Sequence, residues 1–430
     1  MTAQMDRAAS VDIASLIQHD RIHGSLYTDP AIFDLEMTAL FENAWVFVGH
    51  DSEIPEKGDY LTRRIGRQPV IVARGKDEKV RVLLNRCTHR ANMLCRADSG
   101  NAALFRCPYH GWTYANDGRL QGVPFREGYD QEMAEMRSEL GMAQAHQVEI
   151  YGGFIFANLY GNAGSFDEYI GRAKGPIDRL LSLSPEGRIE LRGGWMKHKT
   201  VANWKIVNES QVDGYHPLFT HESVYKAIMP AKVDYASDEL LVATRDLGGG
   251  HNEVDYSREY QSQDAEFIWF KRTPREKMAK YVAAMEASVG ADETHKRFVD
   301  GPPHTFIWPN LFLAEMHVIM VEPVAANESI QYTAPIHIAG GEEINARILR
   351  NAEGAMGPAG FLIADDGEMG ERNQAGLTAK MPEWALLSRG FSSEVQEDKG
   401  LTSYDRTSET TQRAMWVHYK ELMTGKQASA

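Results

Sequence analysis

Cysteine is scarce in this chain: only Cys87, Cys95 and Cys107 occur in 430 residues. So small and odd a number argues against a disulfide framework and favours metal or redox chemistry. Long hydrophobic runs are also missing, since the longest, such as Tyr151–Tyr160, fall well short of the about 18 residues that indicate a membrane span. The opening MTAQMDRAAS has no basic stretch followed by an apolar core, so no secretory signal is indicated. We therefore expect a cytoplasmic protein.

The chain also has no excess of basic side chains. The chain has 46 basic and 60 acidic side chains, for a net charge of −14. This balance repels nucleic acid and anionic membranes, so we expect neither as a partner. Apolar residues make up 43% of the chain and charged residues 25%, which is ordinary for a globular protein with a sizeable core. The length suits two or three domains of roughly 100–200 residues each.

The pattern of apolar residues divides the chain into three parts, without internal repeats. Residues 1–44 are expected to be a helical N-terminal segment that packs on the larger domain, because Ile32–Trp45 has apolar positions at helical spacing. Residues 45–160 show short strands separated by turns, for example Pro69–Arg74 and Val80–Leu84, which predicts a small all-β domain. Residues 161–430 mix both patterns and predict a larger domain with an antiparallel sheet flanked by helices. The fold class is therefore α+β.

Two mixed pairs of metal-binding residues lie in the predicted β domain. The first is Cys87-Thr88-His89, and after seventeen intervening residues comes Cys107-Pro108-Tyr109-His110. Iron–sulfur clusters and zinc both accept thiolate and imidazole ligands. Because each pair has one sulfur and one nitrogen, the pattern fits a Rieske [2Fe–2S] centre, in which two cysteines hold one iron and two histidines the other.

The alternative for these four residues is a structural zinc site. Zinc ligand pairs usually enclose two or more residues, whereas only Thr88 separates Cys87 from His89, so the spacing disfavours zinc. The third cysteine, Cys95, has no histidine at a matching distance. We expect it to be a buried free thiol.

A second constellation lies in Glu209–His221, which contains His216, His221 and carboxylates. These residues could supply most of a two-histidine, one-carboxylate triad, which leaves open positions on ferrous iron for dioxygen. Histidines five residues apart lie about 140° apart around a regular helix, so we expect Pro217 to break the helix and redirect His221. Asp213 lies three residues before His216 and is expected to orient its ring. Taken alone, a histidine pair near an acid is equally consistent with a structural network.

The missing carboxylate is expected in Gly357–Glu368, where Asp365 and Asp366 follow an apolar stretch. Two adjacent carboxylates are costly to bury unless a cation neutralises them, which favours a metal site. The alternative is a helix that begins here with Asp365 as its cap.

Together these motifs resemble the α subunits of Rieske non-haem iron ring-hydroxylating oxygenases, over nearly the whole chain. The family pattern Cys-x-His, then Cys-x-x-His-Gly-Trp, falls on Cys87, His89, Cys107, His110, Gly111 and Trp112. The resemblance implies that His216, His221 and Asp366 bind the mononuclear iron, with Asp365 the less favoured carboxylate. It also implies that Asp213 bridges this iron to the cluster of a neighbouring subunit. Two residues depart from the family pattern: Ala91 replaces a usual glycine, and Ser210 replaces an asparagine whose absence is expected to alter the pocket.

The resemblance further implies a route for electrons. They would pass from NAD(P)H through a separate reductase, with or without a ferredoxin, to the cluster, and then from Cys107 and His110 of one chain to Asp213 of the next. A ring of three α chains follows, and the full-length C-terminal region resembles relatives that also have small β subunits. The expected reaction is hydroxylation of an aromatic substrate, such as an aromatic carboxylate, by dioxygen.

Two other functions remain as alternatives: a Rieske monooxygenase or demethylase made of α chains only, and a zinc-stabilised binding protein. Substrate, regiochemistry and the number of hydroxyl groups added are beyond the sequence. An aromatic carboxylate would need an Arg or Lys in the pocket, and none can be singled out. Apolar residues near the expected iron ligands predict the pocket. They are Val212, Leu218, Met356, Phe361 and Leu362.

Overall fold

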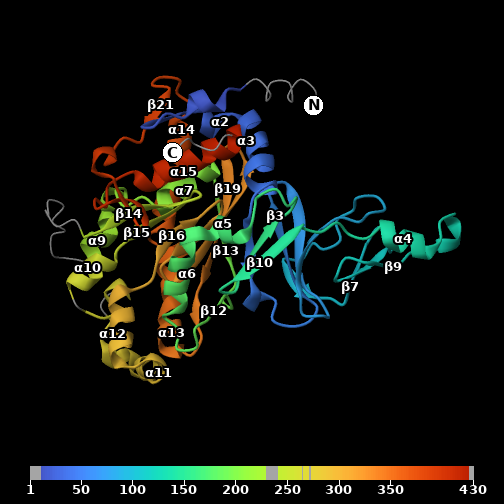
Figure 1. Ribbon diagram of the computed structural model, residues 1–430, viewed down its shortest axis with the longest axis horizontal. Helices are drawn as coiled ribbons and strands as arrows, with labels where there is room; N and C mark the ends of the chain where they lie inside the picture. Colours follow the sequence, from blue (N-terminus) through green and yellow to red (C-terminus); the bar gives the residue numbers. More distant parts are fainter. Residues whose placement is uncertain (1–10, 229–240, 264, 271–272, 426–430) are drawn as a thin grey trace. The chain divides into compact units, whose positions relative to one another are not determined.

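A computed structural model describes residues 11–228, 241–263, 265–270 and 273–425 (Figure 1). The chain forms two compact units, each described here by itself. The β unit comprises Met37–Phe166, and the α+β unit comprises Met1–Glu36 with Asp167–Ala430. This confirms the predicted class: a small all-β domain and a larger domain with an antiparallel sheet and helices. No helix within the described ranges is long and apolar enough to cross a membrane.

The limits of the β unit lie a few residues outside the 45–160 expected from the sequence, because both flanking segments pack on it. Before the first strand, a carboxylate oxygen of Glu42 accepts the backbone N–H of Arg67 at 3.2 Å. After the last strand, the ring of Phe166 lies edge-on to Trp45, with centroids 5.2 Å apart. The N-terminal segment that belongs to the α+β unit is therefore shorter than residues 1–44, and its residues 1–10 lie outside the described ranges.

Three antiparallel sheets build the β unit, in the strand orders β5-β4-β3-β6, β7-β8-β9 and β10-β11-β2. The continuous apolar run Val70, Ile71 and Val72 is completely buried in its core. The strands are β2 (Val46–His50), β3 (Asp59–Ile65), β4 (Gln68–Arg74), β5 (Val80–Leu84), β6 (Ser99–Asn101), β7 (Leu104–Arg106), β8 (Thr113–Ala115), β9 (Leu120–Gly122), β10 (Gln147–Tyr151) and β11 (Phe154–Asn158). One short helix, α4 (Met133–Glu139), follows β9.

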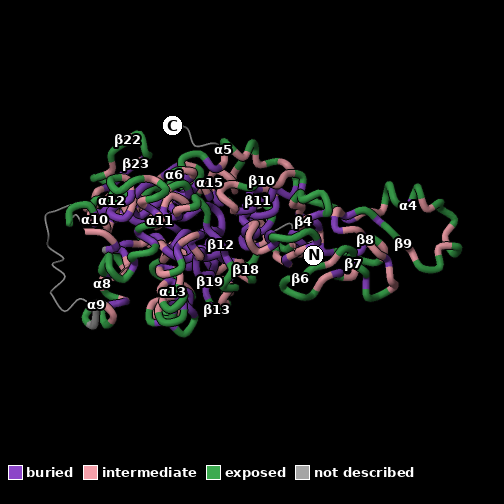
Figure 2. The backbone as a smooth tube through the Cα atoms, turned by 90° about the horizontal axis from the view of Figure 1, so that it is seen from below, coloured by how far each residue is buried: buried purple, intermediate pink, exposed green. Residues whose placement is uncertain are grey.

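A nine-stranded antiparallel sheet forms the centre of the α+β unit within the described residues, in the order β13-β19-β18-β17-β16-β15-β14-β23-β22. Most of its central strands are buried (Figure 2). Its strands are β13 (Met196–Thr200), β14 (Ala243–Gly248), β15 (His251–Asp255), β16 (His304–Ile307), β17 (Leu311–Ala314), β18 (His317–Ala325), β19 (Glu328–Pro335), β22 (Val395–Glu397) and β23 (Gly400–Ser403). Two small strand pairs, β1 (Arg21–His23) with β21 (Trp384–Leu386) and β12 (Ile189–Glu190) with β20 (His337–Ile338), complete the unit.

Strand β19 is unusual because its alternating buried positions are polar. Ser329, Gln331 and Thr333 are buried, whereas Ile330 and Tyr332 between them are partly exposed. The Ser329 hydroxyl donates to the carbonyl of Ala202 at 3.0 Å, and Gln331 accepts a hydrogen bond from Gln211 at 3.3 Å. This buried polar row therefore bonds to both ends of the segment 202–211 and fixes its position on the sheet.

Helices cover the sheet of the α+β unit (Figure 1). Among the described residues the longest is α15 (Thr410–Thr424). The others are α2 (Ser25–Thr28), α3 (Pro30–Glu36), α5 (Phe166–Ile170), α6 (Lys174–Leu181), α7 (Trp204–Gln211), α8 (Pro217–Thr220), α9 (Glu222–Ile228), α10 (Ser257–Ser262), α11 (Ala279–Val289), α12 (Ala291–Asp300), α13 (Glu342–Asn351) and α14 (Ile363–Gly376).

A buried ion pair ties the N-terminal segment to α7. The ammonium of Lys205 lies 2.5 Å from Glu36, and both side chains are completely buried. Trp204 donates to the same carboxylate at 2.9 Å and Tyr419 of α15 donates to it at 2.7 Å. Burial lowers the pKa of Lys205, against the opposing effect of Glu36. Since both carboxylate oxygens of Glu36 face donors, α3, α7 and α15 are held together at one point.

Candidate metal centres

The two ligand loops of the β unit have the same backbone design. In the first, Cys87 N–H donates to Asn92 and the N–H of Ala91 donates back to Cys87, at 2.8 and 2.9 Å. In the second, Cys107 and Gly111 repeat these bonds at 2.7 and 3.0 Å, with the carbonyl of Trp112 in the place of Asn92. Ala91 and Gly111 both have positive φ, 60° and 74°. The position of Ala91 therefore favours glycine, as the family pattern led us to expect.

The four predicted cluster residues come together at the tips of these loops. Cys87 and Cys107 are buried, and the rings of His89 and His110 lie 4.8 Å apart. The His89 ring stacks on Trp112 at 4.9 Å with an interplanar angle of 4°. Its Nδ1 atom is buried and has no hydrogen-bond partner among the described residues. Burial, followed by the charges of His110 and Arg90, lowers the pKa of His89, which favours the neutral form that binds metals.

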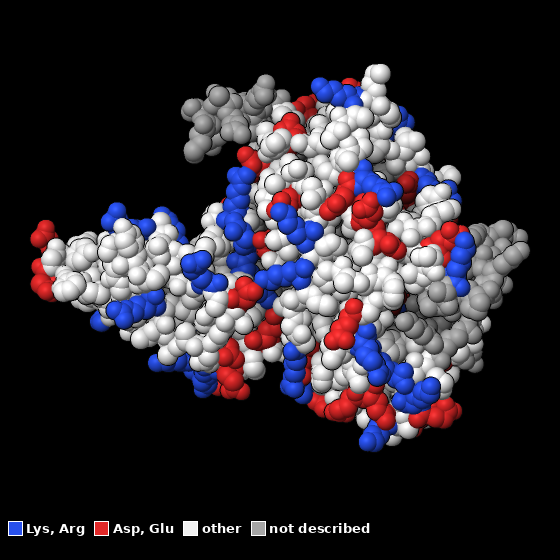
Figure 3. Space-filling view, turned by 180° about the vertical axis from the view of Figure 1, so that it is seen from behind, with Lys and Arg blue, Asp and Glu red and all other residues white. Residues whose placement is uncertain are grey.

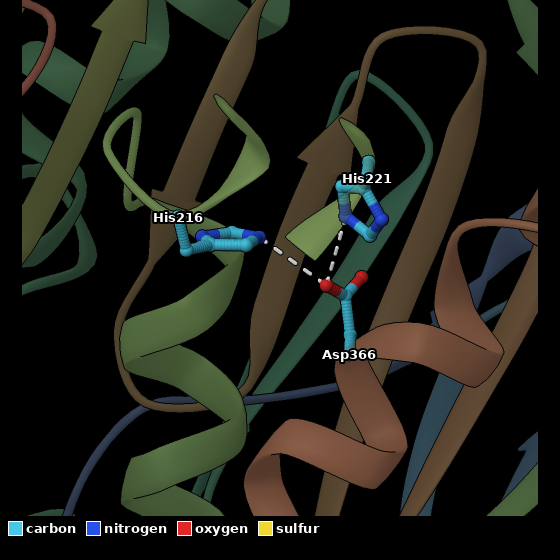
Figure 4. Close-up of side chains that lie close together, drawn as sticks. All are labelled: His216, His221 and Asp366. Carbon is cyan, nitrogen blue, oxygen red and sulfur yellow. Dashed lines mark ion pairs between the residues drawn. The ribbon is translucent and has the colours of Figure 1, made fainter. Parts of the chain in front are cut away.

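Three residues of the α+β unit form a second possible metal site: His216, His221 and Asp366. Oxygen Oδ1 of Asp366 lies 3.2 Å from Nε2 of His216 and 3.0 Å from Nε2 of His221. Figure 4 shows both rings pointing toward this single oxygen. The three ligand atoms lie within 4.8 Å of one another. Two imidazoles and one carboxylate match the ligand set of non-haem ferrous iron.

The backbone that presents the histidines differs from the expectation in one respect. Helix α7 ends at Gln211, well before Pro217, so the proline does not break it. Instead Pro217 is the first residue of the one-turn helix α8. An N–H at this position has no acceptor within the helix, so a proline there loses no hydrogen bond. His216 and His221 flank this turn as its two caps. The short helix, rather than a kink, therefore aims both rings at one point.

Carboxylates surround the two imidazoles. Asp213 lies 3.5 Å from Nδ1 of His216, and Asp365 lies 3.5 Å from Nδ1 of His221. Burial opposes the charged form of His216, but Asp213 and Asp366 outweigh it and raise the pKa of His216 to about 9. Burial also opposes ionisation of Asp366, yet His216 and His221 lower its pKa. Three carboxylates around two imidazoles attract a cation, which fits a metal ion.

Asp365 and Asp366 lie in the first turn of α14, whose cap is Leu362. The alternative of Asp365 as the helix cap is therefore wrong. Asp365 instead lies beside Nδ1 of His221, as Asp213 lies beside Nδ1 of His216.

Side chains from distant elements hold the end of α7 that leads to Asp213. His304 of β16 donates through Nε2 to the carbonyl of Gln211 at 2.9 Å, and Thr411 of α15 donates to that of Val212 at 2.7 Å. These bonds satisfy carbonyls that the end of a helix leaves open. Sequence reasoning missed both residues, because nothing near them in the chain indicates a partner in α7.

Glu209, one turn before Asp213, begins the second constellation, but the sequence assigned it no role of its own. Its carboxylate accepts hydrogen bonds from Tyr27 at 2.8 Å and Trp416 at 2.5 Å. Burial raises its pKa to about 7, although these donors and Lys205 oppose the shift. A lone acid at helical spacing from Asp213 was the only available signal.

The predicted pocket residues do not behave alike. Leu218, Met356 and Leu362 are partly exposed and stay candidates for pocket walls. Val212 is 1% exposed and so leaves no surface for a ligand. Phe361, just before α14, is 72% exposed, and its backbone N–H donates to the carbonyl of Gly354 at 3.2 Å. Neither fits the wall of an enclosed apolar pocket.

Cys95 lies outside both loops and is half-buried. Burial raises the pKa of its thiol to about 11, as expected for an unreactive free cysteine.

Known families match both units. Residues 44–135 match the Rieske [2Fe-2S] domain family, and residues 188–425 match the family described as ring hydroxylating alpha subunit (catalytic domain). The chain is 32% identical over 439 residues to the biphenyl 2,3-dioxygenase subunit alpha of Rhodococcus jostii, which covers 97% of this chain and 92% of the relative. It is 29% identical over 366 residues to the toluate 1,2-dioxygenase subunit alpha of Pseudomonas putida, which covers 82% and 80%.

A solved structure of a naphthalene 1,2-dioxygenase variant bound to phenanthrene has a TM-score of 0.81. It is 25% identical in sequence and covers 95% of this chain and 94% of its own. The chain therefore belongs to the ring-hydroxylating oxygenase α subunits, which are oxidoreductases that carry a Rieske [2Fe–2S] cluster and a mononuclear iron.

Proposed function

We propose that Cys87, His89, Cys107 and His110 hold the Rieske cluster, and that His216, His221 and Asp366 hold the iron of a terminal oxygenase. The observation that carries the second assignment is the convergence of two imidazole Nε2 atoms on one Asp366 oxygen, at 3.2 and 3.0 Å. Both sites fit their metals. The β unit offers two buried thiols and an unpartnered imidazole nitrogen, and the α+β unit offers a cation site.

The residues of the chain have separate tasks in this proposal. When bound, the cluster and the iron supply electron transfer and the activation of dioxygen. Asp213 and Asp365 face the outer nitrogens of the two histidines, which fixes the rings so that each Nε2 faces the metal position. His304 and Thr411 fix the end of α7 and thereby the position of Asp213. The partly exposed side chains of His216 and Asp366 leave room for dioxygen beside the ligands.

Members of this family are multicomponent enzymes that receive electrons from NAD(P)H through a separate reductase or ferredoxin. We propose that the electrons reach the iron through Asp213 from the cluster of a neighbouring copy, in a ring of three α chains accompanied by three small β subunits. A cytoplasmic location fits the use of NAD(P)H.

Charge supports pairing between copies. The β unit has fifteen basic and fifteen acidic side chains, so the net charge of −14 resides in the α+β unit. Around the ligand loops, Arg86, Arg90 and Arg106 are exposed beside the exposed ring of Tyr109. Basic groups are visible over the β unit in Figure 3. A basic rim on one unit complements an acidic unit of the next copy.

The first test is anaerobic purification followed by a visible spectrum and by iron and acid-labile sulfide analysis. A red-brown protein with about three irons and two sulfides per chain is expected from one cluster and one mononuclear site. A colourless protein that contains zinc would contradict the proposal and favour the binding-protein alternative. Co-purification of a small β subunit separates the dioxygenase from a demethylase made of α chains only.

The substrate is an aromatic ring compound. The relatives' names include both a carboxylate, toluate, and an uncharged hydrocarbon, biphenyl. An aromatic carboxylate stays a prediction for this chain, and dioxygen uptake with benzoate, toluene and aniline tests it.

A further inference from the structure

One side of α14 packs against the segment that joins β13 to α7. Ile363, Gly370 and Gln374 of this helix are buried, and they lie at helical spacing on one face. A Cβ built on Gly370 would lie 3.6 Å from the Cβ of Ala202, which is an ordinary contact. Because Asp366 is in the first turn of α14, whatever fixes this helix against the segment also fixes the carboxylate.

Two side chains of α14 bond to backbone N–H groups of that segment. The carboxylate of Glu371 accepts the N–H of Val201 at 3.0 Å, and the amide oxygen of Gln374 accepts the N–H of Asn203 at 2.8 Å. Asn203 is also the N-cap of α7, where its side chain accepts the N–H of Lys205 at 3.0 Å. The helix that carries one proposed iron ligand is therefore tied to the helix that leads to the other two.

A third contact of α14 is much closer than these. A Cβ built on Gly367 would lie 2.7 Å from Cε1 of His198 and 3.2 Å from its Nε2. The imidazole therefore occupies the space that a side chain at position 367 would take. Gly367 directly follows Asp366 in the chain. Since glycine is a poor helix former, its presence in the second turn of α14 fits a need for this close approach.

The sheet in turn holds His198. This residue lies on β13 directly opposite Gln331 of β19, so the two side chains share one face of the sheet. Gln331 is buried and accepts a hydrogen bond from Gln211 of α7 at 3.3 Å. Burial lowers the pKa of His198, while the charges of Glu371 and Asp366 oppose this shift, in keeping with a ring close to both carboxylates. One row across the sheet thus reaches both α14 and the end of α7.

We propose that His198 is a positioning residue for the mononuclear iron: its ring, seated on Gly367, sets the position of Asp366 relative to the two imidazoles. The inference rests on the proposed function, because it takes Asp366 as an iron ligand. No side chain separates the ring from the backbone of α14, so any shift of the ring moves the first turn of the helix. Groups that hold metal ligands in place typically change metal affinity by about 10–100-fold when they are replaced.

The test titrates Fe²⁺ into protein from which a chelator has removed the mononuclear iron while the cluster remains. Gly367→Ala places a methyl group against the His198 ring, so the affinity for Fe²⁺ should fall at least about tenfold. Alanine favours a helix more than glycine does, so a purely local role of Gly367 predicts no such loss. Gly376→Ala, at the last residue of the same helix, is the matched control. No described atom lies within 4 Å of its new Cβ, so it should bind Fe²⁺ like the wild type.

A second variant removes the ring itself. His198→Ala should lower the affinity for Fe²⁺ severalfold, because Asp366 loses its support. Lys199→Ala, at the next residue of β13, is the control, since its side chain is 60% exposed. In the double variant of Gly367→Ala and His198→Ala the clash cannot form. Its affinity should therefore return to that of His198→Ala alone.

Circular dichroism and cluster absorbance check the folding of each variant, and His198→Ala decides the question if Gly367→Ala does not fold. Wild-type affinity in either single variant, or losses that multiply in the double variant, would overturn the role of His198. A wild-type protein that takes up no Fe²⁺ beyond its cluster would contradict the proposed function itself. Wild-type uptake with unaffected variants contradicts only the positioning.

Discussion

The two units build their metal sites in opposite ways. In the β unit, each ligand pair lies in one short loop, and the loop's own backbone bonds hold it, as in Cys87 to Asn92. In the α+β unit, His216 and His221 flank one helical turn, while Asp366 comes from α14, far along the chain. Side chains from β16 and α15 hold the segment between α7 and α8. A loop motif is therefore locally encoded, whereas the iron site depends on the packing of the whole unit.

Removal of one iron ligand should separate the two sites most clearly. His216→Ala is expected to lose the mononuclear iron and reduce oxygenase activity by about a thousandfold or more, because the triad is incomplete. The visible spectrum and the sulfide content of the cluster should remain. Iron analysis together with that spectrum checks this, with His19→Ala, a change at a solvent-exposed histidine, as the control. Loss of both metals would instead indicate a folding defect.

Asp213→Asn tests the connection between the sites. The variant should keep both metals but lower turnover by about a hundredfold or more, because the proposed electron bridge and the orientation of His216 depend on the charge of Asp213. Turnover and the rate at which the reduced cluster is reoxidised in the presence of substrate are the measurements. Asp292→Asn, on the exposed surface of α12, is the control. Normal turnover in Asp213→Asn would show that the bridge assignment is wrong.

The α+β unit should also be more sensitive than the β unit to the loss of one charge. Lys205→Met leaves Glu36 buried without its cation, which should lower the free energy of unfolding by about 3–5 kcal/mol. Adding Glu36→Leu should restore part of the loss. Chemical unfolding measures both. Lys57→Met, which breaks the exposed pair with Glu78, should have no resolvable effect. If Lys205→Met and Lys57→Met lowered the free energy of unfolding equally, the two units would not differ in their sensitivity to the loss of a charge.

Stability should depend on pH through Glu315. Its pKa is about 7 in the folded protein against 4.5 for an ordinary glutamate, so the folded state binds its proton more tightly. The stability that the protonated form provides is complete below about pH 4.5 and is lost as the pH rises to 7, by roughly 2–3 kcal/mol. The difference in unfolding free energy between the wild type and Glu315→Gln, followed from pH 4.5 to 7, measures this effect. A difference that does not vary with pH contradicts it.

The smallest effect is expected in the β unit, at Ala91. Because Ala91 holds a φ of 60°, Ala91→Gly should raise the free energy of unfolding by about 0.5–1 kcal/mol. Gly111→Ala, at the matching position of the other loop, should lower it. Cluster absorbance during chemical unfolding reports both. The same sign for both substitutions would mean that the two loops are not equivalent.

The sequence predicted a small all-β domain beside a larger α+β domain, and it named the three residues that the structure brings together as a candidate iron site. Local spacing indicated the ligand pairs Cys87/His89 and Cys107/His110 and the proximity of Asp213 to His216. Composition indicated only the segment with Asp365 and Asp366, and the family resemblance selected Asp366. Pro217 was misassigned because the end of α7 depends on bonds from other elements. Phe361 was misassigned because closeness in sequence does not determine which way a side chain faces.

The sequence by itself therefore determined the metal chemistry, since ligand identity and spacing require only a few neighbouring residues. Tertiary structure alone decided what surrounds those ligands. The pairing of Glu36 with Lys205 and the contact of His304 with Gln211 join segments far apart in the chain. Such contacts form only when the sheet and helices pack, because burial and the loss of counterions are properties of the folded interior.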